Sequence, residues 1–284
     1  MKGNRVVVIA GCGYVGTVLG ERLVAEGETV FGIRRSAGEF PPGIEPIVCD
    51  LTSDDLANHL PERVDALVYC AAADGPSPQA YRDAYVDGLE NILVAASERG
   101  LQRVIFSSST SVFGQQDGEW VDELALTEPN DFKGETLLEA ESVLASAGCL
   151  SATVRFGGIY GPGRTRFLTS VLEGRIGLVD GTRFTNRIHR ADCAGVLRHL
   201  LNLSALDGLY VGVDRAPAEY NEVVRFIAEL GGIEPSHSAS GPRSRSGSNK
   251  RCSSERLVKS GYIFEFPTFR EGYAAIYQSM TTAS

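Results

Sequence analysis

Three glycines at fixed spacing follow the first apolar run of the chain. Gly11, Gly13 and Gly16 come directly after Arg5–Ala10. In a strand–turn–helix unit, the first glycine permits a tight turn, the second lets a pyrophosphate approach the backbone, and the third lets the helix pack on the strand. The helix N-terminus then favours an anion. We expect dinucleotide binding, with a ligand-free glycine turn as the alternative. The residues concerned are Gly11, Cys12, Gly13, Tyr14, Val15 and Gly16.

The next apolar segment indicates which dinucleotide is held. It ends in Arg34 and Arg35, where an acidic residue would bind the adenosine ribose hydroxyls. Two guanidinium groups and no carboxylate favour a 2′-phosphate, so we predict NADP, with NAD possible. A solvated basic turn is the alternative.

Further contacts to the nucleotide are expected where two later strands end. Asp50, followed by Leu51, comes directly after an apolar run and can accept a hydrogen bond from the adenine amino group. Cys70, Ala71 and Ala72 follow the next run, and the alanines are small enough for a nucleotide to pass close to the backbone. Plain packing explains the alanines equally well.

Strands and helices must alternate to place these loops together. Strands are expected at 5–10, 29–33, 45–49, 65–73, 103–107 and 151–156, and helices at 15–26, 79–99 and 135–147. This alternation predicts an α/β fold with a Rossmann-type, doubly wound parallel sheet. We expect a dinucleotide-binding domain over 1–160, joined by a strand near 208–213. Residues 161–284 are expected to form mostly a small substrate-binding subdomain, with helices at 165–173, 191–200 and 220–230.

Composition narrows the class of protein. The chain has 284 residues, 27 basic and 36 acidic, for a formal net charge of −9. Such an acidic chain is a poor general binder of nucleic acid. No apolar run is long enough for a signal peptide or a membrane helix, so we expect a cytoplasmic protein. The six cysteines lack metal-ligand spacing, as do His59, His199 and His237, so no metal is expected.

Several motifs together resemble one family, the extended short-chain dehydrogenases/reductases of the NAD-dependent epimerase/dehydratase type. Besides the glycine loop they include Cys49-Asp50-Leu51, Tyr69–Ala73, Val86–Asn91, Phe106–Gly114, Arg155–Gly163 and Ile188–Asp192. In that family a tyrosine acts as general acid or base. A lysine four residues later lowers its pKa and holds the nicotinamide ribose, and a Ser or Thr after the fifth strand orients the substrate. The resemblance implies that Ser109 is this hydroxyl.

The tyrosine and lysine of that family are absent from this chain. The matching segment, Lys133–Glu141, has Lys133 in the tyrosine position and Leu137 in the lysine position. No Tyr-x-x-x-Lys occurs anywhere in the sequence. Lys133 could act as an acid or base, could be a fixed cation for an acidic substrate, or could point to solvent. Ser109 and Ser111 belong to a hydroxyl cluster at a strand end, where they could serve chemistry or cap the backbone.

The substrate side is expected to be rich in arginine. The resemblance implies that Tyr160–Arg164 shapes the substrate pocket, and the nearby arginines suit a phosphate or carboxylate. Salt bridging is the alternative. His189 could contact substrate or be structural, and Asp192 could be a helix N-cap. Residues 235–250 read as a mobile loop, and Arg243, Arg245, Lys250 and the adjoining Arg251 could close over a ligand. The candidate substrate residues are Tyr160, Arg164 and His189.

These features support two hypotheses of different class. The first is an NADP-preferring oxidoreductase or epimerase acting on a small anionic or sugar-like, possibly nucleotide-sugar-like, substrate. The second is a non-catalytic NADP(H)-binding redox sensor or regulatory module, which the missing tyrosine and lysine keep open. The resemblance also makes a homodimer possible, through helices at 79–99 and 135–147.

Overall fold

The computed structural model describes residues 4–53, 55–237 and 249–282. The chain divides into two compact units. Unit 1 comprises residues 1–112, 131–155 and 194–210, and unit 2 comprises residues 113–130, 156–193 and 211–284. Each unit is therefore built from segments that are distant in the sequence. Among the described helices, none combines the length and the apolar character that a membrane crossing requires.

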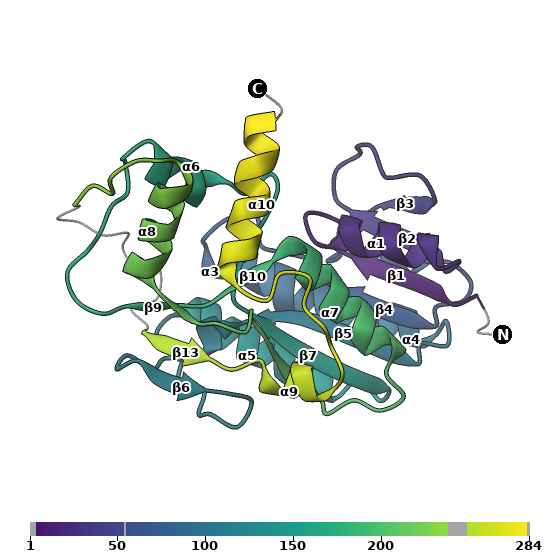
Figure 1. The fold of residues 1–284 in the computed structure, drawn as a ribbon. Coiled ribbons are helices and arrows are strands. Elements are labelled where there is room, and N and C mark those ends of the chain that lie inside the picture. Colours follow the sequence, from purple (N-terminus) through teal and green to yellow (C-terminus); the bar gives the residue numbers. More distant parts are fainter. Residues whose placement is uncertain (1–3, 54, 238–248, 283–284) are drawn as a thin grey trace. The chain divides into compact units, whose positions relative to one another are not determined.

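Seven strands of the described chain form one sheet, in the order β11-β7-β5-β4-β1-β2-β3 (Figure 1). The paired strands from β5 to β3 are all parallel. β1 and β4 are almost entirely buried, as expected for apolar strands covered on both faces. The strands are β1 (Val6–Ala10), β2 (Thr29–Arg34), β3 (Ile44–Val48), β4 (Ala66–Tyr69), β5 (Arg103–Ser109), β7 (Leu150–Phe156) and β11 (Leu209–Gly212).

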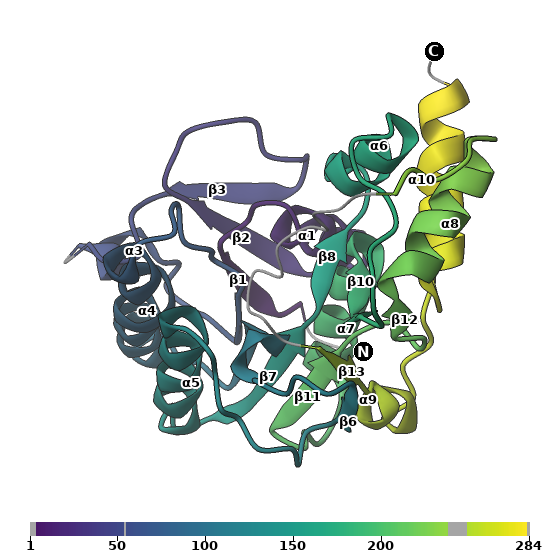
Figure 2. The same cartoon turned by 90° about the vertical axis from the view of Figure 1, so that its left-hand side faces the viewer.

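Helices lie on both faces of this sheet within unit 1. Figure 2 shows α4 and α5 on one face and α1 on the other. α4 buries Leu89, Ile92 and Ala96, whose spacing of three and four residues forms one apolar stripe. The helices are α1 (Gly16–Ala25), α2 (Leu56–His59), α3 (Pro78–Arg82), the π-helical turn η1 (Asp83–Asp87), α4 (Gly88–Ser97), the 3₁₀ turn η2 (Thr110–Val112) and α5 (Phe132–Ala145).

Unit 2 has a core of its own. Leu168, Val224, Ile227, Phe269 and Ile276 are buried together, and they come from three helices. Unit 2 also contains three two-stranded pairs, β8–β10, β9–β12 and β6–β13. The helices are α6 (Arg166–Leu172), α8 (Tyr220–Leu230), α9 (Glu255–Lys259) and α10 (Phe269–Thr282), while α7 (Arg190–Asn202) begins in unit 2 and ends in unit 1. The short strands are β6 (Glu119–Val121), β8 (Gly158–Tyr160), β9 (Phe184–Thr185), β10 (Arg187–His189), β12 (Ala218–Glu219) and β13 (Lys250–Cys252).

The sequence-based expectations hold for the sheet and fail for two segments of unit 2. The strand expected near 208–213 does return to the main sheet as β11. The mobile loop expected over 235–250 is wrong at its end, because Lys250–Cys252 forms β13 and pairs with β6. Arg243 and Arg245, in the same expected loop, lie outside the described residues. α10 was not anticipated, since Gly272 and polar residues dilute its apolar spacing.

Candidate functional site

The glycine turn after β1 has a different steric reason for each glycine. Gly11 has a φ of +84°, and a Cβ there would lie 2.3 Å from the backbone nitrogen of Ala71. A Cβ on Gly16 would lie 2.7 Å from the carbonyl oxygen of Gly11, so the helix packs tightly on the turn. At Gly13 the nearest atom would be 4.0 Å away, and the residue is exposed. The turn is therefore closed by packing at its two ends and open at its middle.

This turn lies where the strand order of the sheet changes direction. From β1 the chain continues outward to β2 and β3, whereas β4 lies on the other side of β1 and leads to β5. In open α/β sheets, ligands bind at such a point, outside the carboxyl ends of the strands. Cys70 and Ala71 follow β4 there: the Cys70 amide donates to Ala10, and Ala71 touches Gly11. Ala72, the next residue, is exposed.

The start of α1 presents backbone dipoles rather than side-chain charges. Within the described residues, neither an acidic side chain nor a side-chain cap occupies the first turn of α1. Thr17 instead donates its hydroxyl to the carbonyl of Gly13 at 2.6 Å. Tyr14 and Val15 are half-buried, and Cys12 is fully buried, with burial raising the pKa of its thiol. The positive end of the helix is thus uncompensated by protein charge, which suits a phosphate.

The two arginines after β2 have different partners. Arg34 donates to the carbonyl of Cys12 and to the hydroxyl of Thr17, and its guanidinium carbon lies 4.2 Å from the centre of the Phe40 ring. It is therefore fixed against the glycine turn. Arg35 forms an exposed ion pair with Asp74. Exposed ion pairs are weak, so a more highly charged phosphate could compete with Asp74 for Arg35.

Asp50 keeps its carboxylate ionised at the end of β3. The amide and hydroxyl of Thr52 donate to Oδ1 at 2.9 and 2.8 Å, and these hydrogen bonds lower the pKa of the Asp50 carboxyl. Leu51 is held by Asn91, whose side-chain amide donates to its carbonyl at 2.8 Å. An ionised acceptor on a braced backbone is suited to the hydrogen bond expected from an adenine amino group.

The serines at the end of β5 form local hydrogen bonds. Ser109 accepts the backbone N–H of Ser111 at 3.2 Å, and both side chains are half-buried in or beside η2. The cap uses an acceptor position of the Ser109 hydroxyl and leaves its proton able to donate. The buried neighbour Ser108 donates to Glu141 at 2.7 Å, and Glu141 pairs with Arg155 at 2.6 Å. This network fixes β5, α5 and β7 to one another.

Lys133 lies on the first turn of α5 beside aromatic rings. Asp131 caps this helix and accepts the backbone N–H of Lys133 at 3.1 Å. The ammonium of Lys133 lies 5.7 Å from the Tyr81 ring centre and 5.8 Å from that of Phe132. Both distances suit a cation–π contact. Leu137, in the position where the family has lysine, is buried in the core.

Tyr85 is a candidate that the sequence analysis missed. It lies in η1, and its hydroxyl is hydrogen-bonded to the backbone of Ala73, beside the alanines that follow β4. Burial raises its pKa to about 12, and its ring centre is 5.4 Å from that of Tyr81, the ring beside Lys133. π-helical turns occur often at functional sites, but nothing in the local sequence signals one here.

The substrate residues proposed for unit 2 differ in exposure. Arg164 is exposed and closes a tight turn by donating its amide to Gly161 at 3.0 Å. Tyr160 is buried, its hydroxyl packed against Gly272 of α10. His189 is also buried, and its Nδ1 accepts the amide of Ala191 at 3.2 Å. His189 thus satisfies an N–H at the start of α7.

Two residues of unit 2 have roles different from those expected. Asp192 is not an N-cap: fully buried, it accepts the Tyr262 hydroxyl and the amides of Glu265 and Phe266, so it anchors the segment before α10. Lys250 is not on a mobile loop, because its buried ammonium donates to the carbonyl of Phe113 at 2.6 Å. Arg251, in the same strand, donates to Gly118 at 2.7 Å.

Asp214 is a buried acid that the sequence analysis missed. It follows β11, is 2% exposed, and accepts the amide of Ala216 at 3.1 Å through Oδ1. Its Oδ2 has no hydrogen-bond partner among the described residues, as is also true of the Tyr160 and Tyr220 hydroxyls. Burial raises the pKa of Asp214 to about 7, and the Arg187 guanidinium opposes this rise. In the sequence, Asp214 is simply an acidic residue after an apolar run, and no local pattern indicates that it is buried.

Comparison with known proteins identifies a family and several similar structures. The model of the NAD dependent epimerase/dehydratase family matches residues 6–180. A structure from Methylobacillus flagellatus, described as a putative NAD-dependent epimerase/dehydratase, is 36% identical, with a TM-score of 0.83, over 98% of this chain and 100% of that one. MoeE5, solved in complex with UDP-glucose and NAD, is 26% identical with a TM-score of 0.81, over 99% and 100% of the two chains.

A relative in Escherichia coli K12 has nearly the same extent. Protein YeeZ is 28% identical over 281 residues, which cover 92% of this chain and 96% of YeeZ. The family model spans the glycine turn, the β4 loop, Lys133 and the turn at Tyr160. The chain belongs to the NAD-dependent epimerase/dehydratase family.

Proposed function

We propose that this protein is an NADP-preferring oxidoreductase or epimerase acting on a small anionic or sugar-like substrate. The observation that carries the proposal is the glycine turn, packed shut at Gly11 and Gly16 and open at Gly13. The uncompensated N-terminus of α1 follows directly. Backbone N–H groups at such a turn suit a pyrophosphate. The bound cofactor supplies hydride chemistry, and the protein positions and shields it.

The preference for NADP rests on Arg34 and Arg35. Arg34 is held in place by hydrogen bonds to Cys12 and Thr17. Arg35 forms an exposed ion pair with Asp74, which a phosphate could displace. MoeE5, which was crystallised with NAD, supports a pyridine nucleotide in this class of fold but not the choice of phosphate. In this chain, two cations stand where a carboxylate would favour NAD.

Calorimetric titration tests this preference. NADPH is expected to bind more tightly than NADH, and Arg34→Ala combined with Arg35→Ala should weaken NADPH about 10- to 100-fold while leaving NADH nearly unchanged. Arg63→Ala is a matched control, because Arg63 also forms an exposed pair with a nearby aspartate, Asp65. Equal affinities of the unmodified protein for NADPH and NADH would refute the preference.

For the catalytic residues we propose Ser109, Ser111 and Lys133. The Ser109 hydroxyl would orient the substrate, while its bond to Ser111 fixes the end of β5. Lys133 would supply the positive charge or proton that the family takes from its tyrosine and lysine. For the substrate-binding residues we propose Arg164, with Tyr160 and His189 as buried supports. A screen of keto acids and nucleotide sugars with NADPH, followed by absorbance, tests turnover.

Variants at Lys133 then assign its role. Lys133→Ala should lower turnover about 100-fold if the ammonium transfers a proton, and should mainly raise KM if it holds an anionic substrate. Lys259→Ala, which removes an exposed lysine paired with Glu255, is the control and should leave both constants unchanged. Unchanged kinetics in Lys133→Ala would remove Lys133 from the mechanism.

A non-catalytic NADP(H) sensor is the second candidate function. Two observations favour it: Leu137 is buried where the family has lysine, and the Lys133 ammonium rests over the rings of Tyr81 and Phe132. A sensor would bind NADPH and NADP with different affinities and would give no turnover in the substrate screen. Sustained oxidation of NADPH with any substrate would exclude this candidate.

A further inference from the structure

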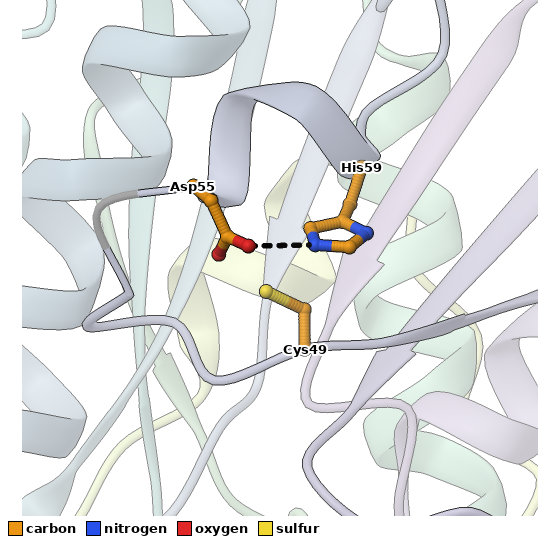
Figure 3. Close-up of side chains that lie close together, drawn as sticks. All are labelled: Cys49, Asp55 and His59. Carbon is orange, nitrogen blue, oxygen red and sulfur yellow. Dashed lines mark hydrogen bonds and ion pairs between the residues drawn. The ribbon is translucent and has the colours of Figure 1, made fainter.

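Three side chains of different ligand chemistry converge beside β3. The donor atoms of Cys49, Asp55 and His59 all lie within 4.8 Å of one another. Cys49 directly follows β3 and is buried, whereas Asp55 and His59 are exposed. Figure 3 shows the sulfur, the carboxylate and one edge of the imidazole turned toward each other. The spacing of histidines along the chain does not indicate this site, because the third donor is a cysteine ten residues before His59, directly after β3.

The local backbone explains why these groups meet. Asp55 precedes α2 and His59 is its last residue, so the two are four positions apart and lie on one side of the helical turn. His59 Nε2 is 3.4 Å from Asp55 Oδ2. Thiolate, imidazole and carboxylate are the three side-chain ligand types of zinc, which bonds them at ~2.0–2.3 Å. Tetrahedral donors at these bond lengths are about 3.5 Å apart, so small rotations of two exposed side chains complete the geometry.

A second layer of hydrogen bonds holds the donors in place. The Asn91 amide donates to the carbonyls of Leu51 and Ser53, both at 2.8 Å, and so holds these two residues in place after Cys49. The Ser53 hydroxyl donates to Asp55 Oδ1, which orients the carboxylate. The Cys49 amide donates to Arg34 at 3.0 Å and continues the pairing of β3 with β2. Metal ligands are typically oriented by such outer contacts.

A nucleophilic triad fits this geometry less well. In a triad the carboxylate accepts a hydrogen bond from the imidazole nitrogen that is remote from the nucleophile, which orients the ring so that its other nitrogen can take the nucleophile's proton. Here Asp55 contacts Nε2, and the Cys49 sulfur faces the same edge of the ring (Figure 3). The three donor atoms therefore gather on one side of the ring, all within 4.8 Å of one another, as ligands of one ion do.

We propose that Cys49, Asp55 and His59 bind a divalent transition-metal ion, zinc in the first instance. Three protein ligands leave the fourth position for water. The site stands next to Asp50, yet it needs neither the cofactor nor turnover. It is independent of the proposed function, and either proposal can fail without affecting the other.

Cobalt(II) substitution tests the site directly in the untagged protein. The expected spectrum has a thiolate-to-cobalt charge-transfer band and the strong visible bands of tetrahedral cobalt, with one zinc ion displacing one cobalt ion per chain. Cys49→Ser should abolish the charge-transfer band. His59→Ala and Asp55→Asn, both at exposed positions, should each weaken zinc binding at least about tenfold.

Two variants serve as matched controls. Cys149→Ser removes a half-buried thiol elsewhere in the chain, and His237→Ala removes another exposed imidazole. Both should leave the spectrum and the zinc affinity unchanged. A thermal melt shows that each variant is folded. Absence of the charge-transfer band in the unmodified protein, its persistence in Cys49→Ser, or unchanged zinc affinity in both His59→Ala and Asp55→Asn would overturn the proposal.

Discussion

Units 1 and 2 differ in how completely their buried polar groups are hydrogen-bonded. In unit 1 the buried Ser108 and Arg155 both bond the half-buried Glu141, and the glycine turn is shaped by backbone packing. In unit 2 the buried oxygens of Tyr160, Asp214 and Tyr220 include atoms without a hydrogen bond to any described residue. Unsatisfied buried polar atoms are costly. We therefore expect the stability of unit 1 to be sensitive to changes in side-chain size, and the stability of unit 2 to be sensitive to changes in protonation.

The largest effect is expected in unit 1, at Gly11. Gly11→Ala places a Cβ 2.3 Å from the Ala71 backbone at a φ of +84°. We expect a loss of about 5 kcal/mol in the free energy of unfolding, measured with denaturant. Gly13→Ala is the control: it meets no atom nearer than 4.0 Å, so it should fold normally and yet bind NADPH more weakly. Equal stability of the two variants would contradict the packing account.

In unit 2 we expect the protonation of Asp214 to have the largest effect on stability. Its pKa is raised by burial from 3.8 to about 7, so between these values the folded protein binds more protons than the unfolded chain. Stability should therefore fall as pH rises from 4 to 7, by up to about 4 kcal/mol, and this contribution should level off above pH 7. Arg187 opposes the shift, while Asp192 and Glu271 add to it.

Asp214→Asn isolates this contribution. The amide oxygen can still accept from Ala216, and the variant should show a flatter dependence of unfolding free energy on pH between 4 and 7. Asp117→Asn, at an exposed position of the same unit, should retain the slope of the unmodified protein. A slope unchanged in Asp214→Asn would show that another group carries it.

A somewhat smaller effect is expected at Asp192, whose polar partners are complete. Asp192→Ala leaves the Glu265 and Phe266 amides and the Tyr262 hydroxyl without their acceptor. We expect a loss of about 3 kcal/mol, with increased hydrogen exchange in the segment before α10. Asp207→Ala, at an exposed position in the loop before β11, is a control expected to change stability little. Unaltered exchange in Asp192→Ala would show that the segment is anchored by other contacts.

The smallest change in stability is expected at the exposed pair Arg35–Asp74 of unit 1. Asp74→Ala should alter the free energy of unfolding by no more than about 0.5 kcal/mol. It should nevertheless strengthen NADPH binding, since Arg35 no longer has a competing carboxylate, and leave NADH binding unchanged. Weaker NADPH binding in Asp74→Ala would contradict the role proposed for Arg35.

Much of unit 1 could be predicted because the residues that shape it lie close together in the sequence. The glycine spacing, the apolar runs and the residues after each strand all lie within short segments, and the parallel sheet brings the strand ends together. Helix 220–230 was likewise found as expected, from its apolar spacing. The acid–base residues could not be settled in this way, because Lys133 has a position in the sequence but acquires its aromatic partner, Tyr81, only in the fold.

The amino-acid sequence by itself determined the family, the parallel sheet and the glycine turn, because backbone conformation and apolar periodicity are properties of neighbouring residues. Tertiary structure alone decided that Asp192 anchors a distant segment, that Lys250 is buried in a strand, and that Cys49 meets Asp55 and His59. Whether a side chain is buried, and which groups it contacts, depends on residues that are remote along the chain. The charge and pairing of a side chain therefore emerge only when those segments pack.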